Sequence, residues 1–194
     1  MAEKTNDQSK IDEINIASVF LKLLFSGIAA SVILGVFCNG VNGMICESYY
    51  PIVLRWENIS FASFSFSLYC AVIAQGVFEG LLFGIGFSLV FTIAALVIFK
   101  KRYSWRLGIK YLFVVVLGAL IGWSLGGIVG CIYATFSPTW IPSQFLPAAF
   151  ADSNISFFRF AWVGGSICGM ELGGLISLSF AIALMYQKSL KLQK

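Results

Sequence analysis

The chain has 194 residues, of which 59% are hydrophobic and only 11% are charged, and its formal net charge is +4. Soluble domains are closer to half apolar and a quarter charged, so this composition excludes a disordered chain and argues against a soluble globular domain. It predicts an all-α, multi-pass integral membrane protein with most of its length in lipid. The lack of histidine removes His-based acid–base chemistry and His-ligated metals.

Four apolar stretches follow one another along the chain and are expected to be transmembrane helices. They cover residues 14–37, 66–99, 111–133 and 160–186. About 20 helical residues cross the hydrocarbon core of a bilayer, so each stretch is long enough. The first follows a polar head, residues 1–13, and contains one charge, Lys22, which can snorkel to the interface.

The basic residues predict the orientation of these spans. Two of the connections contain one basic residue each, Arg55 and Arg159, whereas the tail, residues 187–194, contains three lysines. The connection between the second and third spans contains five basic residues and no acid: Lys100, Lys101, Arg102, Arg106 and Lys110. The positive-inside rule places this connection and both termini in the cytoplasm. The same five residues are candidates for binding anionic lipid headgroups. No feature of the sequence indicates a nucleic-acid partner.

An internal repeat predicts two tandem helical hairpins, residues 1–99 and 100–194. Gly27, Ser31 and Leu34-Gly35 of the first span are matched 91 positions later by Gly118, Gly122 and Leu125-Gly126. Gly80, Gly84, Ser88-Leu89 and Phe91 of the second span are matched 89 positions later by Gly169, Gly173, Ser177-Leu178 and Phe180. Both hairpins begin on the same side, so we expect parallel repeats related by an axis along the membrane normal.

Small residues at a spacing of four form a stripe along each predicted span. Residues i and i+4 lie on one helix face, and small side chains there let helix backbones approach closely in lipid. We therefore predict a glycine-seamed four-helix bundle. The seam residues are Gly27, Ser31, Gly35, Gly76, Gly80, Gly84, Gly118, Gly122, Gly126, Gly130, Gly165, Gly169, Gly173 and Ser177. The seams serve packing within the chain, or one of them also serves a dimer or a partner helix.

Two acids lie within the predicted spans, Glu79 and Glu171, and Gln75 lies one turn before the first. Intramembrane carboxylates are costly, so both are candidate ion or partner contacts. The uncharged run after Glu79 fills a bilayer core, which predicts that Glu79 marks the outer boundary. Glu171 is expected to point away from its glycine seam, and to sit just inside the outer edge of the membrane or to be buried against protein, because a carboxylate that faces lipid is costly unless it is protonated, snorkelled or paired. Arg55 or Arg159 is a possible partner for either acid. A paired structural role, a contact with another chain, and ion or proton handling remain as alternatives.

The cysteines and two Asn-x-Ser sequences allow alternative interpretations. Cys38–Cys46 and Cys70–Cys131 are candidate disulfides on the outer side, or the cysteines pack as small apolar residues. Asn58 and Asn154 are interpreted as helix N-caps, with glycosylation as the alternative.

No cluster of catalytic, cofactor-binding or metal-ligating residues emerges from the sequence, and we expect no enzyme activity. The tiny hydrophilic parts and the glycine seams favour an accessory or assembly subunit of a membrane complex, working as a homo-oligomer or with a partner membrane subunit. The alternative is a small oligomeric transporter or channel that uses Glu171, Glu79 or both.

Overall fold

The computed structural model describes residues 2–46, 68–100, 104–136 and 154–191, and in these ranges the chain is all-helical. The four helices are α1 (Ala2–Ile45), α3 (Leu68–Phe99), α4 (Trp105–Phe136) and α5 (Asn154–Lys191). Each contains a stretch of 30 to 35 residues that is long and apolar enough to cross a membrane. The structure therefore describes four potential membrane spans, in agreement with the four predicted from the sequence.

Three of the four helices, α1, α4 and α5, are longer than the apolar stretches predict. α1 begins at Ala2 rather than near Ile14, so the polar head is helical as well. α4 and α5 extend beyond the predicted 111–133 and 160–186 at both ends. Hydropathy detects only the part of a helix that lipid covers, whereas backbone hydrogen bonds continue into polar sequence. α5 begins at Asn154, where the sequence predicts a helix start.

A short turn between α3 and α4 is built from local signals. Lys100 follows the last residue of α3 with φ of 49°, the left-handed conformation that often ends a helix. Ser104 precedes α4, and its Oγ accepts a hydrogen bond from the Leu107 backbone N–H at 3.3 Å. This is the N-cap contact that satisfies a free backbone donor at a helix start. The end of α3 and the start of α4 therefore both have local features that favour a helix boundary.

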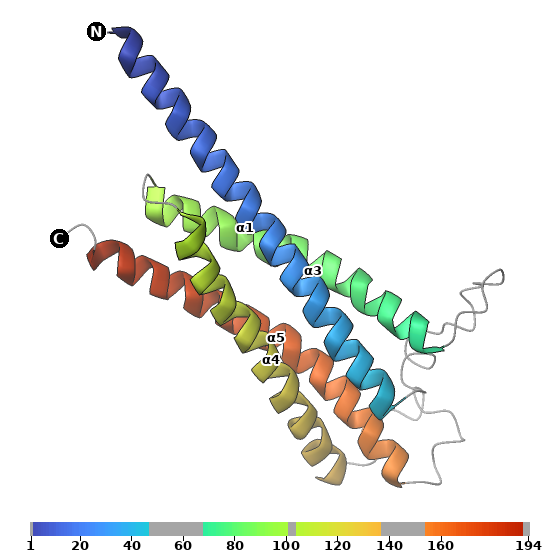
Figure 1. Ribbon diagram of the computed structural model, residues 1–194. Helices are drawn as coiled ribbons and strands as arrows, with labels where there is room; N and C mark the ends of the chain where they lie inside the picture. Colours follow the sequence, from blue (N-terminus) through green and yellow to red (C-terminus); the bar gives the residue numbers. More distant parts are fainter. Residues whose placement is uncertain (1, 47–67, 101–103, 137–153, 192–194) are drawn as a thin grey trace.

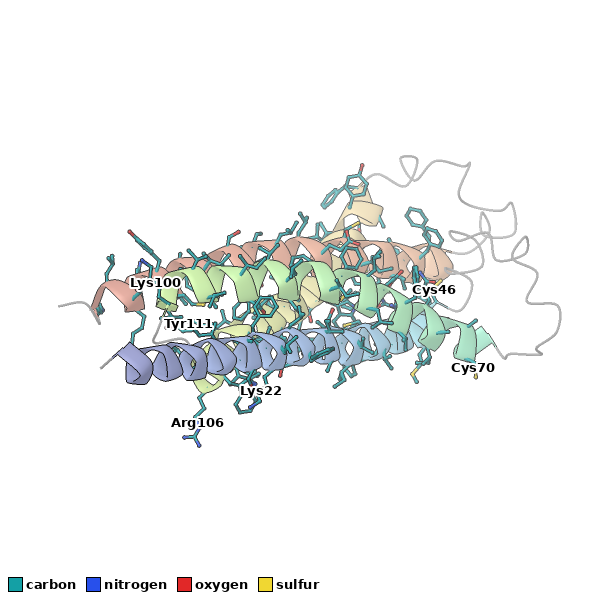
Figure 2. All side chains as sticks on the ribbon, turned by 90° about the horizontal axis from the view of Figure 1, so that it is seen from above. Lys22, Cys46, Cys70, Lys100, Arg106 and Tyr111 are labelled. Atoms are coloured by element: carbon teal, nitrogen blue, oxygen red, sulfur yellow. The ribbon has the colours of Figure 1, made fainter. Side chains whose placement is uncertain are left out.

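The helices form two antiparallel pairs, α1 with α3 and α4 with α5 (Figure 1). The starts of α1 and α4 lie at the same end of the molecule as the ends of α3 and α5. Cys46 and Cys70 lie near the other end, away from Lys100 and Tyr111 (Figure 2). We call α1 and α3 the first hairpin, and α4 and α5 the second hairpin.

The two hairpins meet through two apolar clusters. The larger one surrounds Leu23, Phe91, Leu112 and Met185, near the α3–α4 turn. The smaller one joins Val72 of α3 to Phe160 and Val163 of α5, near the opposite end. All five cysteines lie in the described part of the chain, and none forms a disulfide. The bridges Cys38–Cys46 and Cys70–Cys131 are therefore absent, and Cys38 and Cys46 are buried as small apolar side chains.

Candidate functional site

Glu79 is held between the two helices of the first hairpin. Asn39 Nδ2 of α1 donates a hydrogen bond of 2.8 Å to Glu79 Oε2. Gln75 Nε2, one turn earlier on α3, donates a bond of 2.7 Å to Oε1. Both carboxyl oxygens therefore have a donor, and Asn39 is almost fully buried. The two bonds fix the position of a carboxyl group that would be costly to bury without partners.

A second polar contact joins the two hairpins one turn further along α1. Ser166 Oγ of α5 lies 3.1 Å from Asn42 Oδ1 and 2.9 Å from the Val163 carbonyl, and its hydroxyl can donate to either. Asn42 and Ser166 are both fully buried. In the described part of the chain, Asn42 Nδ2 has no hydrogen-bond partner. Asn39 and Asn42 thus make α1 polar on the face that meets α3 and α5.

Glu171 faces the interface between the hairpins rather than lipid. It is half-buried, and it lines a cavity of about 80 Å³ together with Glu79 and residues from all four helices. The sequence analysis placed Glu171 on a face of its helix away from the glycine seam and allowed that it is buried against protein. In the structure the first hairpin covers that face of α5. Two carboxyl groups that interact electrostatically therefore share one cavity.

One of the two proposed arginine partners, Arg159, can be placed in the described structure. Arg159 is exposed near the start of α5 and forms no ion pair with Glu79 or Glu171. Arg55 lies outside the described residues. Within the part of the chain that is described, no group of three or more His, Cys, Asp or Glu residues could hold a metal ion.

The small residues of the first hairpin lie against one another across α1 and α3. A Cβ atom at Gly76 would lie 2.6 Å from the Gly35 carbonyl oxygen, and one at Gly80 would lie 2.6 Å from Val32 Cα. Gly84 is opposite Ser31, at 2.9 Å from its Cβ, and Gly27 is opposite Ser88. These positions have no room for a side chain without movement of the backbone or of a serine.

The second hairpin has an even closer contact, which is formed almost entirely by glycine. A Cβ atom at Gly173 would lie 2.6 Å from the Gly118 carbonyl oxygen and 2.8 Å from Gly122 Cα. One at Gly169 would lie 2.6 Å from Gly126 Cα. Gly130 and Gly165 face each other in the same way. Backbone rather than side chain is therefore the opposing surface along most of this pair.

An open apolar groove of about 1040 Å³ runs along this contact on the side of the second hairpin that faces away from the first. Its floor includes Gly122 and Gly169, and its walls include exposed side chains such as Leu125 and Ile176. At its end near the α3–α4 turn, Val114 also lines a second pocket, of about 310 Å³, together with Lys110, Lys188 and Lys191.

The basic residues named as lipid contacts are only partly described. Lys100, Arg106 and Lys110 are exposed, and Figure 2 shows Arg106 pointing away from the helices. Lys101 and Arg102 lie outside the described residues. The approach of Lys110 to Lys188 and Lys191 of α5 is a cluster that the sequence analysis did not identify, because it depends on how α4 and α5 pack.

Comparison with models of known families, with curated proteins and with solved structures gives no match.

Two side chains of the polar interface were missed from the sequence. Asn42 and Ser166 were not singled out from the sequence. Asn39 and Asn42 are three residues apart in a hydrophobic helix, which places them on one face, and this spacing was the available signal. Ser166 gave no such signal, because serine is ordinary in membrane helices.

Proposed function

We propose that this chain is a multi-pass integral membrane protein without catalytic activity that acts as a helix-packing assembly subunit of a membrane complex. The observation that carries the proposal is the open groove of the second hairpin, an apolar surface with a glycine floor and exposed aliphatic walls. In lipid, helices associate through close packing over small residues rather than through the hydrophobic effect. A groove of this kind is suited to a further transmembrane helix.

The proposal includes the glycine seams and the duplication. The close approaches of Gly76 to Gly35 and of Gly173 to Gly118 support seams that hold each hairpin together. The duplication is supported by the matching offsets in the sequence and by the same small-residue contact in both hairpins. Cytoplasmic termini remain part of the proposal, on the basis of the basic connection and tail.

Mass measurement of the intact assembly tests this function. The protein is extracted gently from native membranes and examined by native mass spectrometry. The expected result is an assembly of more than one chain, either a homo-oligomer or a stoichiometric complex with another membrane protein. A bare monomer that still carries native lipid would contradict the proposal.

A second candidate function, transport of an ion or proton, rests on Glu79 and Glu171 in one cavity between the hairpins. Intramembrane acids that face a cavity commonly mark ion pathways. If this candidate is right, Glu171→Gln should abolish a pH-dependent flux in liposomes, whereas Arg159→Gln, outside the cavity, should leave it unchanged. Equal flux in the wild-type protein and Glu171→Gln would reject it.

A further inference from the structure

The two hairpins have equivalent faces, but only one of these faces is covered. The cavity between the hairpins is lined by eleven residues of the first hairpin, among them Gly27, Glu79 and Phe87. Each residue on α1 has its equivalent 91 positions later on α4, and each residue on α3 has its equivalent 89 positions later on α5. The equivalents of the three named residues are Gly118, Cys168 and Ile176. All eleven equivalents line the open groove of the second hairpin. The open groove is therefore the counterpart of a surface that, in the first hairpin, the second hairpin covers.

The face of the second hairpin that covers the first hairpin has a counterpart on the first hairpin, and this counterpart is uncovered. The second hairpin contributes seven residues to the cavity, among them Val116, Ala119, Glu171 and Gly174. Their equivalents in the first hairpin are Leu21, Leu24, Phe25, Ile28, Leu81, Leu82 and Ile85, all apolar. Leu21, Phe25, Leu81, Leu82 and Ile85 are between 41% and 63% exposed. We call these seven residues the outer face of the first hairpin.

We propose that the open groove of the second hairpin binds the outer face of the first hairpin of a second copy of this chain, and this inference rests on the assembly function proposed above. Both surfaces belong to parallel hairpins, so a second copy in the same membrane orientation presents the required face. The contact is head-to-tail, which gives a closed ring if the rotation between copies closes.

The sizes of the side chains fit this occupant. Within the chain, large groove residues such as Phe87 face small ones: a Cβ atom at Gly174 would lie 3.7 Å from the Phe87 ring. Between copies the outer face is bulkier, because Ile85 replaces Gly174 there, whereas the groove changes little when Ile176 replaces Phe87. The outer face therefore gains more side-chain volume than the groove loses, and the open groove of about 1040 Å³ is much larger than the covered cavity of about 80 Å³.

The acid pair explains why one interface is within the chain and the other between chains. Glu79 and Glu171 belong to the covered interface, and their equivalents at the uncovered surfaces are Cys168 and Leu82. An interface between copies must pass through a lipid-exposed state before it forms, and carboxylates there would be costly. Apolar residues at these two positions remove that cost.

Cysteine cross-linking tests the proposal, because Cys168 is exposed in the groove. The other four cysteines are replaced by alanine, Leu82→Cys is introduced, and membranes are treated with a short bifunctional thiol reagent. We expect a cross-linked product of twice the chain mass, at a yield at least tenfold above that of the chain with Leu82 unchanged. Ile85→Cys, one turn away, provides a second test if the first variant fails to fold.

The matched control is Ile33→Cys. Ile33 is 70% exposed, and its separation in sequence from the end of the first span equals that of Leu82 from the start of the second span, so both lie at a similar depth. A cross-link of equal yield from Ile33→Cys would overturn the proposal, because it would report random collision. Failure of both Leu82→Cys and Ile85→Cys to link folded chains would overturn it as well. If native mass spectrometry then finds a different protein bound, only the second-copy inference fails; a monomer with bound phospholipid rejects the assembly function too.

Discussion

The first hairpin buries its groove against the rest of the chain, whereas the second hairpin leaves the equivalent groove open. The covered groove contains Glu79, fixed by Asn39 and Gln75, and it faces Glu171. The open groove has no ionisable group at the equivalent depth except the Cys168 thiol, and its walls are aliphatic and aromatic. Polar side chains therefore lie where protein covers them, and apolar side chains lie where the surface meets lipid or another helix.

The two hairpins also differ in how closely their helices approach. Each hairpin has a serine at one end of its seam, Ser88 opposite Gly27 and Ser177 opposite Gly118, but only the first has a second serine, Ser31 opposite Gly84. A Cβ atom at Gly84 would lie 2.9 Å from Ser31 Cβ, whereas one at Gly173 would lie 2.6 Å from the Gly118 carbonyl oxygen and 2.8 Å from Gly122 Cα. The second hairpin should therefore be the more sensitive to added side-chain volume.

The largest expected effect is from Gly173→Leu. The new side chain would meet the backbone of Gly118 and Gly122, so the α4–α5 pair must separate. We expect a loss of at least about 3 kcal/mol in the free energy of unfolding in detergent micelles. The matched control is Gly86→Leu, because a Cβ atom there meets nothing within 4 Å. Equal stability of Gly173→Leu and Gly86→Leu would contradict a packing role for the seam.

A smaller effect is expected from Asn39→Leu, which tests the hydrogen bond that holds Glu79 in the covered groove. The substitution removes the donor to Glu79 Oε2, and hydrogen bonds to charged groups contribute about 1.5–3 kcal/mol. We expect a destabilisation of about 2 kcal/mol, measured by the same unfolding titration. In a Glu79→Leu background the cost of Asn39→Leu should fall by at least about 1 kcal/mol. Strictly additive costs would show that the two side chains do not depend on each other.

The smallest expected effect comes from adding a single methyl group to each seam and comparing the two losses of stability. Gly84→Ala places a methyl group 2.9 Å from Ser31 Cβ and 3.3 Å from Ile28 Cα, a smaller overlap than at Gly173, and the gain of about 1 kcal/mol in helix propensity offsets it. Gly173→Ala meets backbone, so we expect a net loss of about 1–2 kcal/mol. Unfolding of both variants measures the difference, and a Gly84→Ala protein less stable than Gly173→Ala would reverse the order given to the two hairpins.

Hydropathy and spacing predicted the coarse fold because both act within one helix. Apolar runs and basic residues indicate spans, and the i, i+4 spacing of Gly118, Gly122 and Gly126 indicates a helix face. The sequence could not predict which hairpin face covers which, because that depends on contacts between distant residues. The position of Glu171 at the interface between the hairpins was left open for this reason, and the approach of Ser166 to Asn42 across 124 positions was missed.

The measurement that tests the central claim most directly is the mass of the native assembly after the open groove is filled. Ile176→Trp places a large ring in the groove, and Ile33→Trp places the same ring on an exposed position of α1 outside the outer face. Native mass spectrometry should find an assembly of several chains for the wild type and Ile33→Trp, and a folded monomer for Ile176→Trp. An unchanged assembly in Ile176→Trp would contradict the claim that this groove holds the complex together.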